Sequence, residues 1–83
     1  MSWFVYIVEC ADGTLYTGVT TDLERRVKQH NSGKGARYTR ARRPVRLVAS
    51  FDAENNSTAC KEEYRIKQLS RTEKIALIKT FNA

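Results

Sequence analysis

The sequence predicts a small α/β domain in ββαβαα order, with a three-stranded sheet flanked by helices. Aromatic and β-branched runs over residues 3–10, 15–17 and 45–51 predict the strands. Capping residues ahead of apolar positions at helical spacing predict the helices. A chain of 83 residues buries only about 60 to 65% of its unfolded surface and holds one core. Residues 1–83 are therefore expected to form a single domain.

The first two strands are expected to form a β-hairpin around residues 11–14. A loop of three residues, with Gly13 as a G1 bulge, would bring Tyr6 and Tyr16 onto one face of the sheet. A loop of two or four residues would place them on opposite faces. We expect the three-residue loop, and we expect the second strand to end at Gly18.

A helix over residues 23–31 is predicted after Asp22, which is a good N-cap. On a helical wheel Arg26 and His30 flank the apolar stripe, whereas Arg25 points away from it. Arg26 and His30 are thus expected to lie side by side at the border of the core.

The second half of the chain is predicted to hold a strand and two helices. Residues 33–44 are expected to form a loop, and residues 52–56 a turn after the third strand. Ser57 is expected to cap a helix that ends at Leu69. The capping box of residues 70–73 predicts a last helix, with three apolar residues directed inward: Ile75, Leu77 and Ile78.

The charge is concentrated in one segment of the chain. Residues 25–46 hold nine basic residues and no acidic one, and the other segments hold six basic and nine acidic residues, so +9 and −3 give the net charge of +6. A one-signed segment of this density attracts phosphate polymers such as nucleic acid. The alternative is a solvated basic loop that serves solubility. A membrane surface is a poorer partner, because the segment lacks an apolar helical face.

The N-terminal segment and the cysteines exclude several classes of protein. The segment lacks a basic leader and reaches Glu9 too early for a signal peptide or a membrane span, so a cytoplasmic protein is expected. Cys10 and Cys60 are far apart and form no C-x-x-C pair, which argues against a zinc site and a disulfide framework. Both are expected to be small buried apolar residues.

Four short motifs occur in a fixed order along the chain. They are Phe4-Val5-Tyr6, Tyr16-Thr17-Gly18, Leu23-x-x-Arg26-x-x-x-His30 and a helical glutamate at position 62 or 63. This ordered set resembles the GIY-YIG nuclease superfamily over nearly the whole chain. It is most similar to the short stand-alone bacterial members and to the nuclease domain of a structure-specific resolvase subunit that works with a scaffold partner.

The resemblance implies a divalent-metal-dependent endonuclease that hydrolyses phosphodiester bonds of DNA, with branched or flapped DNA among its candidate substrates. Glu63 would hold Mg²⁺ or Mn²⁺, and Arg26 would neutralise charge on the phosphate. Tyr6 or Tyr16 would activate or position the nucleophilic water. His30 would assist as a proton acceptor or hydrogen-bond partner.

The sequence leaves the choice between the two glutamates to the resemblance. Glu62 and Glu63 both flank apolar helix positions, so periodicity does not separate them. The resemblance prefers Glu63, and an exposed ion pair with Lys67 is the plainer alternative for it. Two positions depart from the family pattern: Phe4 replaces a glycine and Thr17 replaces an apolar residue.

The loop supplies the expected nucleic-acid contacts, which are Lys34, Arg37, Tyr38, Arg40, Arg42 and Arg43. Phosphate contacts of this kind give salt-sensitive binding without base reading. Tyr38 could stack on a base or pack the loop against the domain. Two further functions stay open. One is a nucleic-acid-binding module that keeps the scaffold but cleaves little or nothing, in repair or stress tolerance, and the other is a protein-interaction domain.

Overall fold

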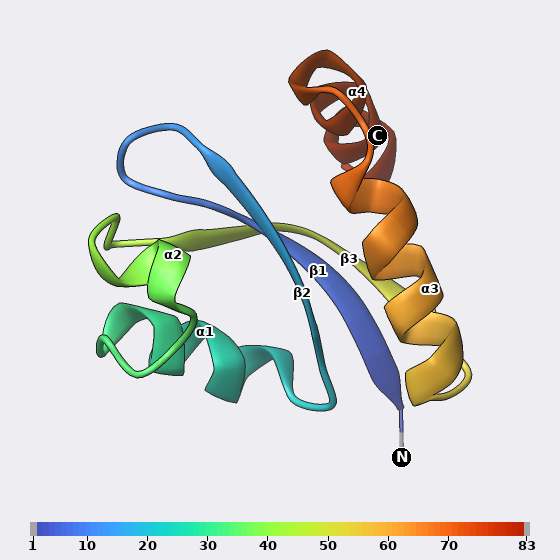
Figure 1. Ribbon diagram of the computed structural model, residues 1–83, viewed down its shortest axis with the longest axis horizontal. Helices are drawn as coiled ribbons and strands as arrows, with labels where there is room; N and C mark the ends of the chain where they lie inside the picture. Colours follow the sequence, from blue (N-terminus) through green and yellow to red (C-terminus); the bar gives the residue numbers. More distant parts are fainter. Residues whose placement is uncertain (1, 83) are drawn as a thin grey trace.

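The sheet has three antiparallel strands in the spatial order β2-β1-β3 (Figure 1). The computed structural model describes residues 2–82. The strands are β1 (Trp3–Glu9), β2 (Leu15–Thr20) and β3 (Arg46–Ala53), and the helices are α1 (Leu23–Asn31), α2 (Arg37–Arg40), α3 (Asn56–Lys67) and α4 (Arg71–Phe81). The predicted ββαβαα order is confirmed, with the short α2 added between α1 and β3.

The loop between β1 and β2 has the predicted three-residue form. The Cys10 amide donates to the Thr14 carbonyl at 2.8 Å, and the Gly13 amide donates to the Cys10 carbonyl at 2.9 Å. Gly13 has φ of +83°, the left-handed conformation of a G1 bulge. The loop length sets the register of the hairpin.

That register places both tyrosines on one face, as predicted. Val8 pairs with Tyr16, and Tyr6 pairs with Gly18. Gly18 does not end β2, which continues to Thr20, so the predicted end was wrong. A Cβ at Gly18 would collide with the Tyr6 hydroxyl, so the glycine serves the close approach of a side chain rather than a turn.

Helices cover both faces of the sheet (Figure 1). On the Tyr6 face, α1 adds Leu23 and Val27 to a core formed by Tyr6, Val8, Cys10 and Val45. On the opposite face, α3 adds Ala59 and Ile66 to a core formed by Val5, Ile7 and Ala49. From α4, Leu77 and Ile78 pack against this second core, although α4 buries no residue fully. Each face of the sheet thus has its own core.

Several predicted boundaries hold and others shift. Asp22 caps α1, and Ser70 and Glu73 form the predicted capping box of α4. Asn55 caps α3 in place of Ser57, because the Asn55 Oδ1 accepts from the Thr58 amide at 2.9 Å. β3 begins and ends one to two residues later than predicted.

Two further expectations were wrong. The predicted loop contains α2, a single turn that shows no apolar periodicity and so left no helical signal in the sequence. Cys60 is exposed on α3, where its Sγ donates to the Asn56 Oδ1 at 3.2 Å, whereas Cys10 is buried as expected. Within residues 2–82, no helix is both long and apolar enough to span a bilayer.

Candidate functional site

The Tyr6 hydroxyl is the centre of a buried hydrogen-bonded cluster. It lies 2.8 Å from the Nε2 of His30. The Nε of Arg26 donates to it at 3.2 Å. Tyr6 is 1% exposed and His30 is fully buried. The hairpin and α1 thus bring together three of the residues that the sequence predicted.

His30 is held on its other side by α2. Its Nδ1 lies 2.7 Å from the Thr39 Oγ1, and the Thr39 hydroxyl donates to the Ala36 carbonyl at 2.9 Å. A Cβ at Gly35 would collide with the His30 ring, so the chain passes directly against the imidazole. Both ring nitrogens therefore have buried partners.

Arg26 extends from α1 with part of its guanidinium already engaged. Besides Tyr6, it donates through Nη1 to the Gln29 Oε1 at 3.1 Å. A guanidinium has five N–H donors, so further donors remain for an anion. The two contacts fix the plane in which those donors point.

Tyr16 lies beside the cluster rather than inside it. Its ring meets the His30 ring edge-on at 5.5 Å and stacks against the Tyr38 ring at 5.9 Å, centroid to centroid. The Arg42 guanidinium lies 4.0 Å from the Tyr38 centroid. Tyr16 is half-buried, and its hydroxyl makes no hydrogen bond within residues 2–82. This hydroxyl is open to an incoming group.

The structure separates the two glutamates that periodicity could not separate. The charge of Glu63 makes a minor contribution to the raised pKa of the Tyr6 phenol, after burial and the charge of Tyr16. The Glu63 side chain is 25% exposed and pairs with Lys67 at 3.4 Å. The Lys67 ammonium lies 5.9 Å from the Tyr16 ring centroid, so this edge of α3 reaches the tyrosine face.

Glu62 faces a different part of the molecule. It pairs with Arg65 at 2.8 Å. It also lines a cavity of about 130 Å³ over the opposite core, together with Val5, Phe51, Asp52, Arg65, Ile66 and Leu77. Glu62 therefore does not converge with the tyrosines.

Burial controls the electrostatics of the cluster. It raises the pKa of the Tyr6 phenol; Arg26 opposes that rise, and Tyr16 and Glu63 add to it. Burial, followed by the charge of Arg26, lowers the pKa of His30. Both groups are therefore neutral at neutral pH.

The donor set fits a weakly held hard cation rather than a closed metal centre. No three His, Cys, Asp or Glu side chains of the described residues gather into a metal-binding group. Glu63 offers a single half-buried carboxylate. Mg²⁺ often keeps several waters and takes substrate phosphate oxygens besides one or two carboxylates, so Glu63 is compatible with such a site.

The predicted nucleic-acid residues differ in their contacts. Arg42 pairs with Asp12 at 3.0 Å and donates to the Tyr38 carbonyl at 2.9 Å. Tyr38 is 39% exposed and stacks on Tyr16, so its ring packs against the domain and keeps part of its surface free. Arg43 donates to two backbone carbonyls. Among residues 2–82, three of these predicted contacts are exposed cations with neither an ion pair nor a side-chain hydrogen bond: Lys34, Arg37 and Arg40.

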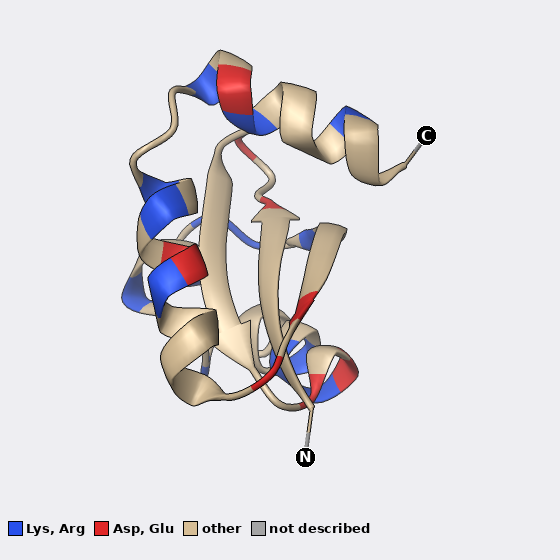
Figure 2. Ribbon diagram, turned by 90° about the vertical axis from the view of Figure 1, so that its right-hand side faces the viewer, with Lys and Arg blue, Asp and Glu red and all other residues tan. Residues whose placement is uncertain are grey.

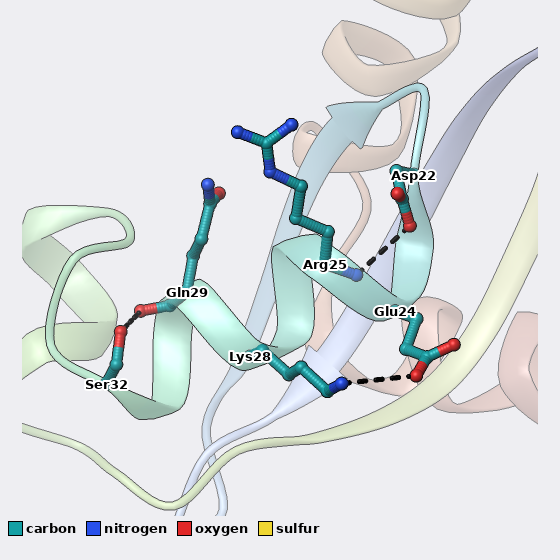
Figure 3. A pocket seen from close by; sticks show the side chains of 6 residues that line it. All are labelled: Asp22, Glu24, Arg25, Lys28, Gln29 and Ser32. Carbon is teal, nitrogen blue, oxygen red and sulfur yellow. Dashed lines mark hydrogen bonds and ion pairs between the residues drawn. The ribbon is translucent and has the colours of Figure 1, made fainter.

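Two surface grooves are lined by residues of α1 and of the chain between α1 and β3. One, of about 510 Å³, is lined by Asn31, Arg40, Ala41, Arg43 and Pro44. The other, of about 480 Å³, runs along α1 and is lined by Asp22, Glu24, Arg25, Lys28, Gln29 and Ser32. Figure 3 shows Arg25 and Gln29 extending from the same side of α1. Because Gln29 also binds Arg26, this groove adjoins the cluster.

Elsewhere the charges are mixed. Figure 2 shows acidic segments next to basic ones on α1, α3 and the start of α4. Lys28 pairs with Glu24 at 3.3 Å, and Arg46 pairs with Glu9 at 2.7 Å. The chain between α1 and β3 differs from these helices because it holds basic residues and no acidic one.

Sequence reasoning missed two members of this site. Thr39 and Gln29 contact predicted residues, but each is a single polar residue without a motif of its own. The ion pair of Lys67 with Glu63, which the sequence offered as an alternative, is present at 3.4 Å. The glycine at position 18 was part of a quoted motif, and its role against Tyr6 becomes visible only in the hairpin register.

Comparison with known proteins gives a family match over most of the chain. The family model described as GIY-YIG catalytic domain matches residues 2–76. A UPF0213 protein of Desulfotalea psychrophila is 62% identical over 79 residues, which cover 94% of this chain and 72% of that protein. A UPF0213 protein of Halobacterium salinarum is 58% identical, over 88% of this chain and 95% of that protein.

Two solved structures are similar in fold and sequence. The solution NMR structure of a UPF0213 protein from Bacillus halodurans has a TM-score of 0.62 and 51% identity, over 96% of this chain and 85% of that chain. The solution NMR structure of a protein from E. faecalis has a TM-score of 0.66 and 42% identity, over 99% and 88%.

Proposed function

Because the chain belongs to the GIY-YIG family of nuclease catalytic domains, we propose that it is an endonuclease that hydrolyses phosphodiester bonds of DNA with a divalent metal ion. The observation that carries this proposal is the convergence on Tyr6. Arg26 and His30 bind its hydroxyl, and Glu63 pairs with Lys67, whose ammonium lies 5.9 Å from the ring centroid of the neighbouring Tyr16.

The hydroxyl of Tyr16 is the better candidate to orient the attacking water. It makes no hydrogen bond within residues 2–82, whereas the Tyr6 hydroxyl is buried and bound on two sides. In the reaction the water oxygen bonds to phosphorus, one ester P–O bond breaks, and the departing alkoxide takes up a proton. Tyr16 would hold the water in line with the breaking bond.

Arg26 would stabilise the negative charge that develops on the phosphoryl oxygens. Its Nε and Nη1 contacts to Tyr6 and Gln29 fix the guanidinium before substrate arrives. Preorganised donors are more effective than mobile ones, because no reorganisation is needed as the charge develops. Tyr6 and His30 then serve Arg26 as a rigid, neutral support.

Glu63 would hold the metal ion, Mg²⁺ or Mn²⁺. When bound, such an ion supplies charge neutralisation at the phosphate and the leaving oxygen. The Lys67 ammonium now occupies the vicinity of the carboxylate at 3.4 Å. Lys67 is half-exposed on a long stem, so it can turn toward a phosphate when the cation binds.

The substrate backbone would lie along the chain between α1 and β3. Lys34, Arg37 and Arg40 carry uncompensated charge there, and Arg43 is aimed by backbone carbonyls into the adjoining groove. Arg42 and Tyr38 contribute mainly by supporting Tyr16. Contacts of this kind do not read bases directly, which suits branched or flapped DNA as the substrate and a scaffold partner that supplies specificity.

The test is cleavage of labelled single-stranded, duplex, flap and four-way DNA at low salt, with Mg²⁺ or Mn²⁺. Glu63→Gln should abolish cleavage, and Glu62→Gln is its matched control because it alters the neighbouring carboxylate that faces away. Arg26→Lys should lower the rate by roughly 100-fold or more, since lysine keeps the charge but loses the planar donors.

The second candidate is a binding module that keeps the fold without cleaving. It is favoured by the near-complete burial of the Tyr6 hydroxyl. Salt-sensitive DNA binding with no cleavage of any substrate by wild-type protein would replace the nuclease with this function. Equal loss of cleavage in Glu62→Gln and Glu63→Gln would remove the metal assignment.

A further inference from the structure

Four hydrogen bonds connect the Arg26 guanidinium to a backbone carbonyl on the far side of His30. Arg26 Nε lies 3.2 Å from the Tyr6 hydroxyl, which lies 2.8 Å from His30 Nε2. His30 Nδ1 lies 2.7 Å from the Thr39 Oγ1, which lies 2.9 Å from the Ala36 carbonyl oxygen. The series runs from Arg26 in α1 to Tyr6 in β1, returns to α1 at His30, and continues to Thr39 in α2.

The end of the series at α2 fixes the direction of its hydrogen bonds. A carbonyl oxygen can only accept, so the Thr39 hydroxyl uses its one hydrogen on Ala36. The Thr39 oxygen must then accept from its other neighbour, His30 Nδ1. The contact requires the proton of the imidazole to be on Nδ1.

The other end is consistent with the same answer. The Nε of Arg26 can only donate, so the Tyr6 oxygen accepts from it. The Tyr6 hydroxyl can donate its hydrogen to a bare His30 Nε2, but the Tyr6 oxygen can equally accept from Nε2–H, so the Thr39 end decides between the tautomers. In the opposite tautomer, two hydrogen-free atoms would face each other at 2.7 Å, between Nδ1 and Thr39 Oγ1.

We propose that Thr39 is a positioning residue: its hydroxyl fixes His30 as the Nδ1–H tautomer and thereby orients the Tyr6 hydroxyl and the Arg26 guanidinium. Thr39 and His30 are both fully buried, so no bulk water competes for these bonds. Hydrogen bonds in series polarise one another in a medium of low dielectric constant. The effect of Thr39 on cleavage rests on the proposed nuclease function. The assignment of the His30 tautomer does not depend on that function.

The backbone around Thr39 allows this contact through the short helix α2 and the close approach at Gly35. α2 is one turn long and has no side-chain N-cap, so it has little intrinsic stability. Gly35 lets the backbone pass directly against the imidazole, where a Cβ would collide with the ring. The bond between Thr39 and His30 is therefore a main attachment of α2 to α1.

The first test reads the tautomer directly. His30 is the single histidine of the chain, so ¹⁵N NMR of the imidazole at neutral pH reports on it without assignment ambiguity. Wild type and Thr39→Ser should show a protonated Nδ1 and a bare Nε2. Thr39→Val removes the acceptor and should shift the population toward Nε2–H.

A wild-type spectrum with a predominantly protonated Nε2 would overturn the proposal without any variant. An unchanged Nδ1–H population in Thr39→Val would overturn it equally. Urea denaturation should accompany these spectra, because Thr39→Val leaves the buried His30 Nδ1 without its partner and should lower the urea concentration at the unfolding midpoint. If Thr39→Val does not fold, wild type and Thr39→Ser still decide the result.

The second test concerns catalysis. Thr39→Val should lower kcat for DNA cleavage by roughly 10- to 100-fold, as loss of an orienting partner does elsewhere, with KM little changed, and Thr39→Ser should restore it. A shifted tautomer with wild-type kcat would overturn the catalytic part. If wild-type protein cleaves no DNA, the nuclease function fails, and the spectra alone decide the role of Thr39.

Discussion

The Tyr6 hydroxyl and the His30 Nε2 are 2.8 Å apart, and neither side chain has more than 1% of its surface exposed. A buried polar pair of this kind is stable only while both partners remain matched. The hairpin supplies one partner and α1 the other, so their contact joins the sheet to its first helix. The free energy of unfolding should therefore be sensitive to changes in either member of the pair.

Stability should depend on the protonation of His30. Its pKa is lowered in the folded state by burial and by Arg26, from the ordinary value of 6.5. The unfolded chain therefore binds the proton more tightly, so the free energy of unfolding should fall as the pH drops below about 6.5. Urea denaturation at about pH 7.5 and about pH 5.5, one unit either side, measures the fall. His30→Gln should lack this component, and an identical fall in that variant would contradict the assignment.

Thr17→Val should stabilise the protein by roughly 1 kcal/mol. The Thr17 hydroxyl oxygen is the one buried side-chain nitrogen or oxygen atom among the described residues that lacks a hydrogen-bond partner. Valine has nearly the same shape and removes the unpaired group. Chemical denaturation provides the measurement, and Thr72→Val, at an exposed position on α4, is the control with an expected change within about 0.5 kcal/mol. A loss of stability in Thr17→Val would reveal an unseen partner for this hydroxyl.

Gly18→Ala should destabilise the protein by about 1 to 3 kcal/mol, the usual cost of overpacking. The added methyl would collide with the Tyr6 hydroxyl and displace it from His30 and Arg26. Gly13→Asn is the control, because that position has open space around it and asparagine tolerates its positive φ. Thermal unfolding together with the His30 ¹⁵N signals would show whether the displacement occurs. Wild-type stability and signals in Gly18→Ala would rule out the close approach.

Arg40→Ala should weaken DNA binding and lower the slope of log K against log salt by about one unit. Arg40 is exposed and has no ion pair within residues 2–82. Arg46→Ala is the matched comparison, because Arg46 is already neutralised by Glu9 at 2.7 Å. Fluorescence anisotropy over a series of salt concentrations gives both slopes. Equal slopes for the two variants would move the binding surface away from the groove beside α2.

Local chemistry explains which parts of the fold could be predicted. The three-residue turn at Gly13 fixed the hairpin register and so the shared face of the tyrosines. Asp22 and the apolar spacing of α1 fixed the positions of Arg26 and His30. These features depend on a few adjacent residues, so a single sequence contains the information.

Contacts between distant residues explain the rest. Arg42 meets Asp12 across thirty positions, and Thr39 meets His30 only after α2 forms. Neither pair leaves a periodic pattern. Helical periodicity does not separate Glu62 from Glu63, whereas their tertiary neighbours do: Glu62 lines the cavity over the Val5 core, and Glu63 pairs with Lys67 near Tyr16.

The placement of α3 has a consequence for the proposed nuclease site. Tyr6, Arg26 and His30 belong to one core, whereas Glu63 arrives on a helix anchored in the other core through Ala59 and Ile66. Partial opening of that second core would withdraw the carboxylate while the Tyr6 cluster stayed intact. Hydrogen exchange confined to α3 and α4 would then report a reversible loss of the proposed activity. A ligand that held α3 against the sheet would favour the form in which Glu63 stays near the Tyr6 cluster. The core around Tyr6 would remain folded in both forms, and the core around Val5 would open and close.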